Sequence, residues 1–182
     1  MPGKENIHAD FLSRSYNDNI EWSISNDIFE TIVNMFFVPS FDLFASANNT
    51  KSKYFYSMYP EIGSAGTDAF NFTWLENSYA FPPFSLIPKV LEKVIADRLN
   101  NFILICPFWP AQSWYPFVTK MLVGRPLQFS ANNLYLSYRS KVQHPLRHMQ
   151  LLGCLLSCSC YVTGKFQKKQ FRPFVHASLI AQ

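Results

Sequence analysis

Apolar positions along this chain follow a helical period in some stretches and form compact runs in others. Apolar side chains recur at spacings of three and four over residues 28–36, directly after Ser25, which is a favourable N-cap, and Pro39 stops the pattern. The same period predicts a helix over residues 86–95 and a shorter one over residues 113–122.

Compact apolar runs between these helices predict strands at residues 41–45, 51–59, 78–81 and 102–106. The last run is the clearest strand of the chain, and Pro107 ends it. Strands that alternate with helices imply a parallel sheet of the βαβ type. The pattern therefore predicts an α/β fold with a Rossmann-like sheet, either complete or incomplete.

The pattern loosens after Gly124. Residues 146–161 are apolar enough to predict one buried helix, whereas residues 165–172 are basic and are predicted to be exposed. The predicted organisation has three parts: a tail over residues 1–19, an α/β domain over residues 20–125, and a C-terminal extension over residues 126–182 that is partly helical and basic.

Composition excludes a globally disordered chain. The 182 residues are 48% hydrophobic and 15% charged, so the chain is able to bury a core. Four cysteines, none of them before Cys106, do not resemble a disulfide framework, and the start of the chain has no secretory pattern. No apolar stretch reaches the roughly 18 residues of a membrane span. We therefore expect an intracellular protein without a membrane partner.

The charge distribution is compatible with nucleic-acid binding. The formal net charge is +4, and no aspartate or glutamate occurs from Arg139 to the end of the chain. Lysine and arginine are interleaved with phenylalanine in the basic segment, and this pattern suits contacts with phosphates and bases. The alternative is a solvated tail. The residues predicted to bind nucleic acid are Lys165, Lys168, Lys169 and Arg172.

A metal site is not predicted. His144 and His148 share one face of a hypothetical helix, as do Cys154 and Cys158, but the spacing fits no standard zinc finger. Free cysteines on a buried apolar helix are the preferred interpretation.

Chemically informative residues follow the predicted strands. Asp42 lies at the first strand, Asp68 follows the second, and a rigid Pro82-Pro83-Phe84 turn follows the third. In a parallel sheet the carboxyl ends of the strands share one edge, where ligands bind. Each feature also has a structural explanation, because aspartates cap turns and proline pairs end strands. Trp74 is expected in the core or in the wall of the site.

The first fourteen residues resemble a known pattern. The stretch Gly3-Lys4-Glu5-Asn6-Ile7-His8-Ala9-Asp10-Phe11-Leu12-Ser13-Arg14 is similar to the last helix of the ribonuclease H domain in retroelement polyproteins. The resemblance implies that Asp10 corresponds to a metal-binding aspartate of that family. Two-metal hydrolysis needs several converging carboxylates, and the rest of that domain is absent from this chain. Asp10 alone therefore predicts no activity.

A second resemblance covers residues 21 to about 125. Their ordered motifs resemble the Dam-like adenine methyltransferase domain that follows ribonuclease H in DIRS-type retrotransposons. The motifs are Glu21-Trp22, Asp42-Leu43-Phe44-Ala45-Ser46, Asn49, Asp68-Ala69-Phe70, Trp74, Tyr79-Ala80-Phe81-Pro82-Pro83-Phe84 and Pro107-Phe108-Trp109-Pro110-Ala111-Gln112. The resemblance implies a methyltransferase sheet with S-adenosylmethionine as cofactor, DNA rather than RNA as partner, other parts of a polyprotein as neighbours, and a nuclear location.

The same resemblance assigns roles to particular residues. It implies cofactor contacts from Asp42, Phe44, Ala45 and Asp68. It also implies that Pro82, Pro83 and Phe84 form the catalytic segment. In that segment the aromatic ring stacks on an adenine that has left the duplex.

Two departures from the family pattern decide between the functional hypotheses. Phe81 stands where the family has a hydrogen-bond acceptor, and a phenyl ring accepts no ordinary hydrogen bond. Ala45-Ser46-Ala47 stands where a glycine-rich loop is expected. We therefore favour a non-catalytic module that binds nucleic acid or spaces a polyprotein. The alternatives are an active DNA adenine N6-methyltransferase and a decayed transposon copy without function.

Overall fold

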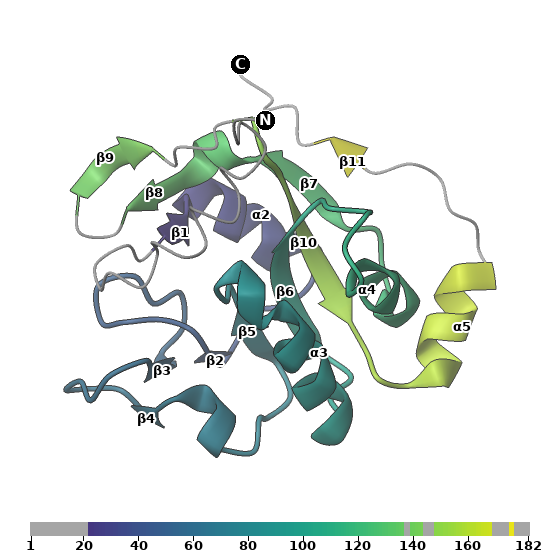
Figure 1. Ribbon diagram of the computed structural model, residues 1–182, viewed down its shortest axis with the longest axis horizontal. Helices are drawn as coiled ribbons and strands as arrows, with labels where there is room; N and C mark the ends of the chain where they lie inside the picture. The colour runs from purple at the N-terminus through teal and green to yellow at the C-terminus, as the bar shows by residue number, and fades with distance from the viewer. Residues whose placement is uncertain (1–21, 137–138, 144–147, 169–174, 177–182) are drawn as a thin grey trace, which may run out of the picture.

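The computed structural model describes residues 22–136, 139–143, 148–168 and 175–176, and Figure 1 shows them arranged around a central sheet. The strands of this sheet lie in the order β11-β7-β10-β6-β5-β2-β3-β4. Their bounds are β2 Phe41–Asp42, β3 Tyr54–Ser57, β4 Gly66–Thr67, β5 Ser78–Ala80, β6 Phe102–Pro107, β7 Leu127–Ser130, β10 Gln150–Leu156 and β11 Val175–His176.

Most neighbouring strands of this sheet are parallel. Strands β4, β3, β2, β5 and β6 all run in one direction. Strand β10 runs antiparallel between β6 and β7, so β7 again follows the direction of β6. The order along the sheet reverses between β2 and β5, which makes this position a topological switch point. The predicted α/β class is confirmed, and the mostly parallel sheet is compatible with a Rossmann-like fold.

Helices α2, α3 and α4 lie where the helical period predicted them, whereas α5 was not predicted. Ser25 caps α2 by accepting a hydrogen bond from the Ile28 amide through its Oγ, at 3.4 Å. Pro88 lies in the first turn of α3, where its missing amide proton is not needed. The helices are α2 Asn26–Met35, α3 Ile87–Ala96, α4 Tyr115–Met121 and α5 Cys160–Lys168, with short 3-10 turns η1 Ala69–Asn71, η2 Phe84–Leu86 and η3 Ala131–Asn133.

The sheet separates two hydrophobic layers, and β6 shows how the sequence alternates between them. Phe102, Leu104 and Cys106 face the layer that contains α3 and α4, whereas Ile103 and Ile105 face the layer that contains α2. All five side chains are fully buried. A continuous apolar run is thus required here, because both faces of the strand are covered.

A smaller antiparallel sheet lies beside the α2 layer. Its strands are β1 Trp22–Ile24, β8 Leu134–Leu136 and β9 Arg139–Gln143, in the order β1-β8-β9. Ile24 and Leu134 anchor this sheet to the α2 layer. The small sheet was not predicted, because its strands are short and carry no clear alternation.

The helix predicted over residues 146–161 is wrong. Residues Gln150–Leu156 form β10 at the centre of the sheet, and α5 begins only at Cys160. A short apolar run buried on both faces satisfies a strand as well as a buried helix, so periodicity did not distinguish them. The extension over residues 126–182 is consequently not only helical: it supplies β7, β10 and β11 to the main sheet. The tail over residues 1–19 lies outside the described residues.

Gly153 in β10 allows α2 to pack closely on the sheet. A Cβ at this position would lie 3.1 Å from Cδ1 of Ile32 and 3.3 Å from its Cγ1. We expect Gly153→Val to lower the free energy of unfolding by about 1–3 kcal/mol, because the added carbons overpack this contact. Urea denaturation measures the change. Gly164→Ala in α5 is the control, since no atom lies within 4 Å of its added carbon, and a loss of equal size there would contradict the packing explanation.

Candidate functional site

The residues predicted to bind cofactor and substrate gather at the carboxyl edge of the parallel strands. Asp42 is the last residue of β2, Asp68 follows β4, and Phe81 follows β5. Because β2 and β5 pair at the switch point of the sheet, Asp42, which ends β2, and Phe81, which follows β5, lie at the ends of neighbouring strands. The sequence therefore predicted the common edge, and the parallel pairing supplies it.

Asp42 is buried, and both of its oxygens are engaged by the turn that follows it. Its Oδ2 accepts a hydrogen bond from the Lys51 amide at 3.0 Å, and its Oδ1 accepts one from the Phe44 amide at 3.4 Å. Burial raises the pKa of this carboxyl from 3.8 to about 7, although both amides and the charge of Lys51 oppose the shift. The two hydrogen bonds of the Asp42 side chain therefore hold the turn that follows it.

Asp68 makes a similar turn but remains partly exposed. Its Oδ1 accepts a hydrogen bond from the Phe70 amide at 3.1 Å and caps η1. Its backbone φ of 55° lies in the left-handed region that aspartate tolerates better than most residues. Asp68 and Asp42 thus both begin an Asp-x-Phe turn in which the carboxylate binds the amide of the phenylalanine.

The two phenylalanines bring these turns together. The rings of Phe44 and Phe70 meet edge to face with centroids 5.5 Å apart, and both rings also contact Trp74. Trp74 in turn stacks on Phe102 of β6, with parallel rings 5.7 Å apart. Phe44 is therefore oriented toward the aromatic core, which is the predicted environment of Trp74.

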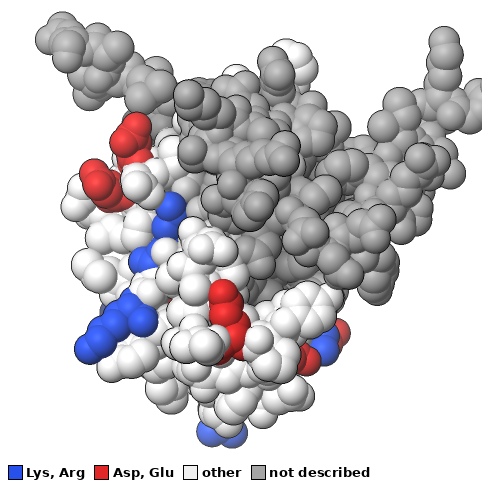
Figure 2. All heavy atoms as spheres, turned by 90° about the vertical axis from the view of Figure 1, so that its left-hand side faces the viewer, with Lys and Arg blue, Asp and Glu red and all other residues white. Residues whose placement is uncertain are grey.

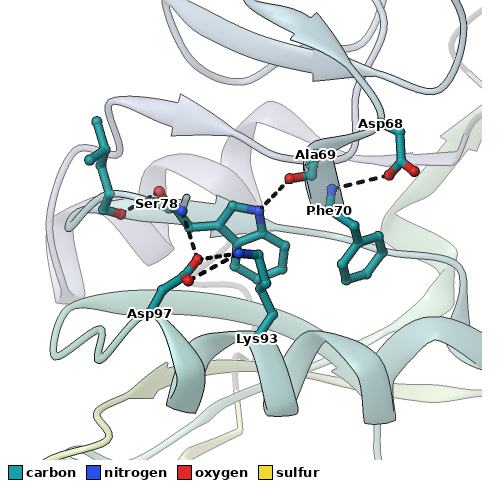
Figure 3. A network of polar contacts seen from close by, with 8 residues as sticks. Asp68, Ala69, Phe70, Ser78, Lys93 and Asp97 are labelled. Atoms are coloured by element: carbon teal, nitrogen blue, oxygen red, sulfur yellow. Dashed lines mark hydrogen bonds and ion pairs between the residues drawn. The ribbon is translucent and has the colours of Figure 1, made fainter. Parts of the chain in front are cut away.

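Figure 3 shows the polar contacts that hold the Trp74 segment on α3. The Trp74 indole donates to the Ala69 carbonyl at 2.9 Å, and its backbone amide donates to Oδ2 of Asp97 at 2.7 Å. Lys93 forms an ion pair with the same carboxylate at 2.8 Å. These contacts fix the connection between β4 and β5, and they give Lys93 and Asp97 a structural role.

The predicted catalytic segment continues β5 at the same edge. Pro82 is buried, Pro83 is exposed, and Phe84 begins η2. The ring of Phe81 lies 6.3 Å from the ring of Phe84, and the ring of Phe84 meets Trp109 edge to face at 5.3 Å. Phe81 therefore lies at the position for which the resemblance implies an acceptor, Phe84 lies at the position for which it implies a stacking ring, and Trp109 packs against Phe84.

Backbone amides of the turn after β2 donate hydrogen bonds to acceptors within the protein. Ala45 is buried, and no helix follows β2, because residues 43–53 form a turn that leads directly into β3. Several amides of this turn donate to acceptors within the protein: Phe44 to Asp42, Ala45 to the Tyr56 carbonyl, Ser46 to Asn49, Ala47 to Glu61 and Lys51 to Asp42. Glu61, which closes the turn from 14 residues away, had no signal in the sequence.

The basic residues lie apart from this edge. Lys165 is exposed on α5, and its ammonium lies 4.1 Å from the ring centroid of Tyr161. Lys168 ends the same helix. Lys169 and Arg172 lie outside the described residues.

The hypothetical zinc residues do not share a helix. Cys154 is buried in β10, and Cys158 lies in the turn before α5. The Cys106 thiol and burial raise the pKa of Cys154 well above its usual value. Within the described part of the chain, no three histidine, cysteine, aspartate or glutamate side chains are grouped to hold a metal ion. His144 lies outside that part.

Comparisons with known proteins give no family. Neither the scan against protein-family models nor the search of curated proteins found a match. The described helices include none that is both long and apolar enough to span a membrane.

Proposed function

We propose that this chain is a piece of a DIRS-type retrotransposon polyprotein whose Dam-like domain keeps the methyltransferase framework without the transfer chemistry and binds nucleic acid. The motif order supports the origin. The fold supports the framework, because an antiparallel strand inserted beside the last parallel strands is also a feature of the methyltransferase variant of the Rossmann-like sheet.

The proposal that the domain lacks transfer activity depends on the environment of Asp42 and on the side chain of Phe81. Both oxygens of Asp42 serve amides of its own turn, and its raised pKa leaves it partly protonated near neutral pH. Such a group is a poor partner for a sulfonium or an α-ammonium group. Phe81 offers no acceptor for an exocyclic amine, and its ring packs near Phe84. These residues fit S-adenosylmethionine and adenine poorly.

An active adenine N6-methyltransferase is the second candidate. Asp68 remains partly exposed, and Phe84 and Trp109 remain partly buried beside the end of β5. These groups would suit a ribose hydroxyl and a flat base, respectively. The candidate nevertheless requires an acceptor that Phe81 does not provide, and losing a positioned acceptor costs on the order of 10²–10³ in rate in other enzymes.

Isothermal calorimetry with S-adenosylmethionine tests the non-catalytic part. We expect no binding heat at millimolar cofactor for the full chain, because the turn after β2 is closed by its own acceptors. The Phe81→Asn variant is the companion measurement, and we expect no methyl transfer to adenine-containing DNA from it either. Binding heat, or activity gained by Phe81→Asn, would favour a methyltransferase that lost one residue.

Binding of fluorescent DNA, followed by anisotropy at several salt concentrations, tests the nucleic-acid part. We expect binding that weakens steeply with salt, because released counterions drive contacts between lysines and phosphates. If the chain bound neither DNA nor S-adenosylmethionine, the proposal would fail and a decayed copy without function would be favoured.

A further inference from the structure

Two exposed aromatic side chains lie on neighbouring helices in the second half of the chain. Phe117 of α4 is 55% exposed and Tyr161 of α5 is 68% exposed. The two helices pack together, and the Gln167 side chain donates to the Lys120 carbonyl at 2.9 Å. The buried faces of these helices include Val118 and Phe166, so the exposed rings are not needed for the core.

Each exposed ring carries a lysine from its own helix. The ammonium of Lys120 lies 5.9 Å from the centroid of Phe117, and that of Lys165 lies 4.1 Å from the centroid of Tyr161. The spacings of three and four residues place each pair on one helix face. A ring beside a cation is the combination that binds a base together with its phosphate.

The charge of this half of the chain is one-sided. Ten lysines and arginines follow Asp97, and no aspartate or glutamate follows it. Figure 2 shows a different part of the surface, on the side of β3 and β4, where acidic side chains are interspersed with basic ones. No carboxylate from the second half of the chain is therefore present to neutralise Lys120 or Lys165.

We infer that the outward faces of α4 and α5 bind single-stranded nucleic acid, an inference that rests on the proposed function and names its substrate. A base stacks on Tyr161 and another on Phe117, and each lysine moves from its ring to an adjacent phosphate. Single strands fit this surface because their bases are accessible to the rings, whereas a duplex keeps its bases stacked inside. The predicted edge at β2 and β5 takes no part in this contact.

Anisotropy of a labelled single-stranded oligothymidine and of a matched duplex, with the full 182-residue chain, tests the inference. We expect the single strand to bind more tightly. Tyr161→Ala and Phe117→Ala should each weaken single-strand binding by about 5- to 150-fold, the range for loss of one stacked base. Lys165→Gln should lower the slope of log affinity against log salt by about 0.7, which corresponds to one phosphate contact on a single strand.

The matched control is the Lys53 and Tyr54 pair on the opposite part of the sheet. The Lys53 ammonium lies 5.1 Å from the Tyr54 centroid, and Tyr54 is 47% exposed. Tyr54→Ala should leave binding unchanged. Equal affinity for duplex and single strand, with no effect of Tyr161→Ala, would overturn the inference and leave nucleic-acid binding itself intact. If the chain bound neither the single strand nor the duplex, both this inference and the proposed nucleic-acid binding would be overturned. Circular dichroism of each variant checks that its fold is retained.

Discussion

Trp74→Ala should lower the free energy of unfolding by about 3–5 kcal/mol, the usual cost of removing a large buried aromatic side chain. Trp74 is 2% exposed, and its ring contacts Phe44, Phe70 and Phe102. The substitution would leave a cavity between the two Asp-x-Phe turns and β6, and it would leave the Ala69 carbonyl without its donor. A domain of this size has roughly 5–15 kcal/mol to lose, so the effect is large.

Urea denaturation monitored by far-UV circular dichroism measures this loss. Trp74→Phe keeps an aromatic ring but removes the indole donor, so we expect a smaller loss than for alanine. Leu75→Ala is the neighbouring control, because Leu75 is 55% exposed and lies outside the core. A change below about 1 kcal/mol for Trp74→Ala would contradict the position of this ring in the core.

Stability should fall as the pH rises from about 4 to about 7 because of Asp42. Burial raises the pKa of its carboxyl in the folded protein to about 7, whereas the ordinary value is 3.8. Between these values the folded protein holds a proton that the unfolded chain has released, so each pH unit lowers the free energy of unfolding by about 1.4 kcal/mol. The contribution is fully present below pH 3.8, and it is lost by the time the pH passes about 7. The whole change is on the order of 4 kcal/mol.

Urea denaturation at pH 4, 5.5, 7 and 8 measures the effect as a difference between variants. Asp42→Asn cannot titrate, so its stability should decline less over this range than that of the natural chain. Asp68→Asn is the matched control, since it alters the other Asp-x-Phe turn and keeps the buried Asp42. Parallel curves for the natural chain and Asp42→Asn would show that Asp42 does not release its proton in this range in the folded protein.

Helices α2, α3 and α4 and strand β6 were predictable because their signals are local. Ser25 caps α2, the apolar positions of α3 repeat with a helical period, and the uninterrupted run of β6 reflects burial on both faces. Strands β4 and β10 were missed for opposite reasons. Strand β4 has two residues and no pattern, whereas β10 is an apolar run that fits a buried helix as well as a strand.

The candidate site divides in the same way. The positions of Asp42, Asp68 and Phe81 at or past the ends of predicted strands implied a common edge, and the parallel pairing of β2, β3, β4 and β5 produces one. The hydrogen-bond donors of these carboxylates could not be predicted from the sequence. The amide of Lys51, for example, reaches Asp42 only because the chain turns back after β2. The exposure of Phe117 and Tyr161 could likewise not be predicted from the sequence, because it depends on which faces of their helices pack against the core.

The sequence by itself determined the alternation of helices and strands as far as α4, the α/β class, the one-sided charge, and the phenylalanine that precedes the proline pair. Each of these depends on residue type and on spacing over a few positions. Only the tertiary structure decided the strand order, the central place of β10, and the enclosure of Asp42 by amides of its own turn. Those features depend on pairing and burial between segments far apart in the chain, which no local pattern specifies.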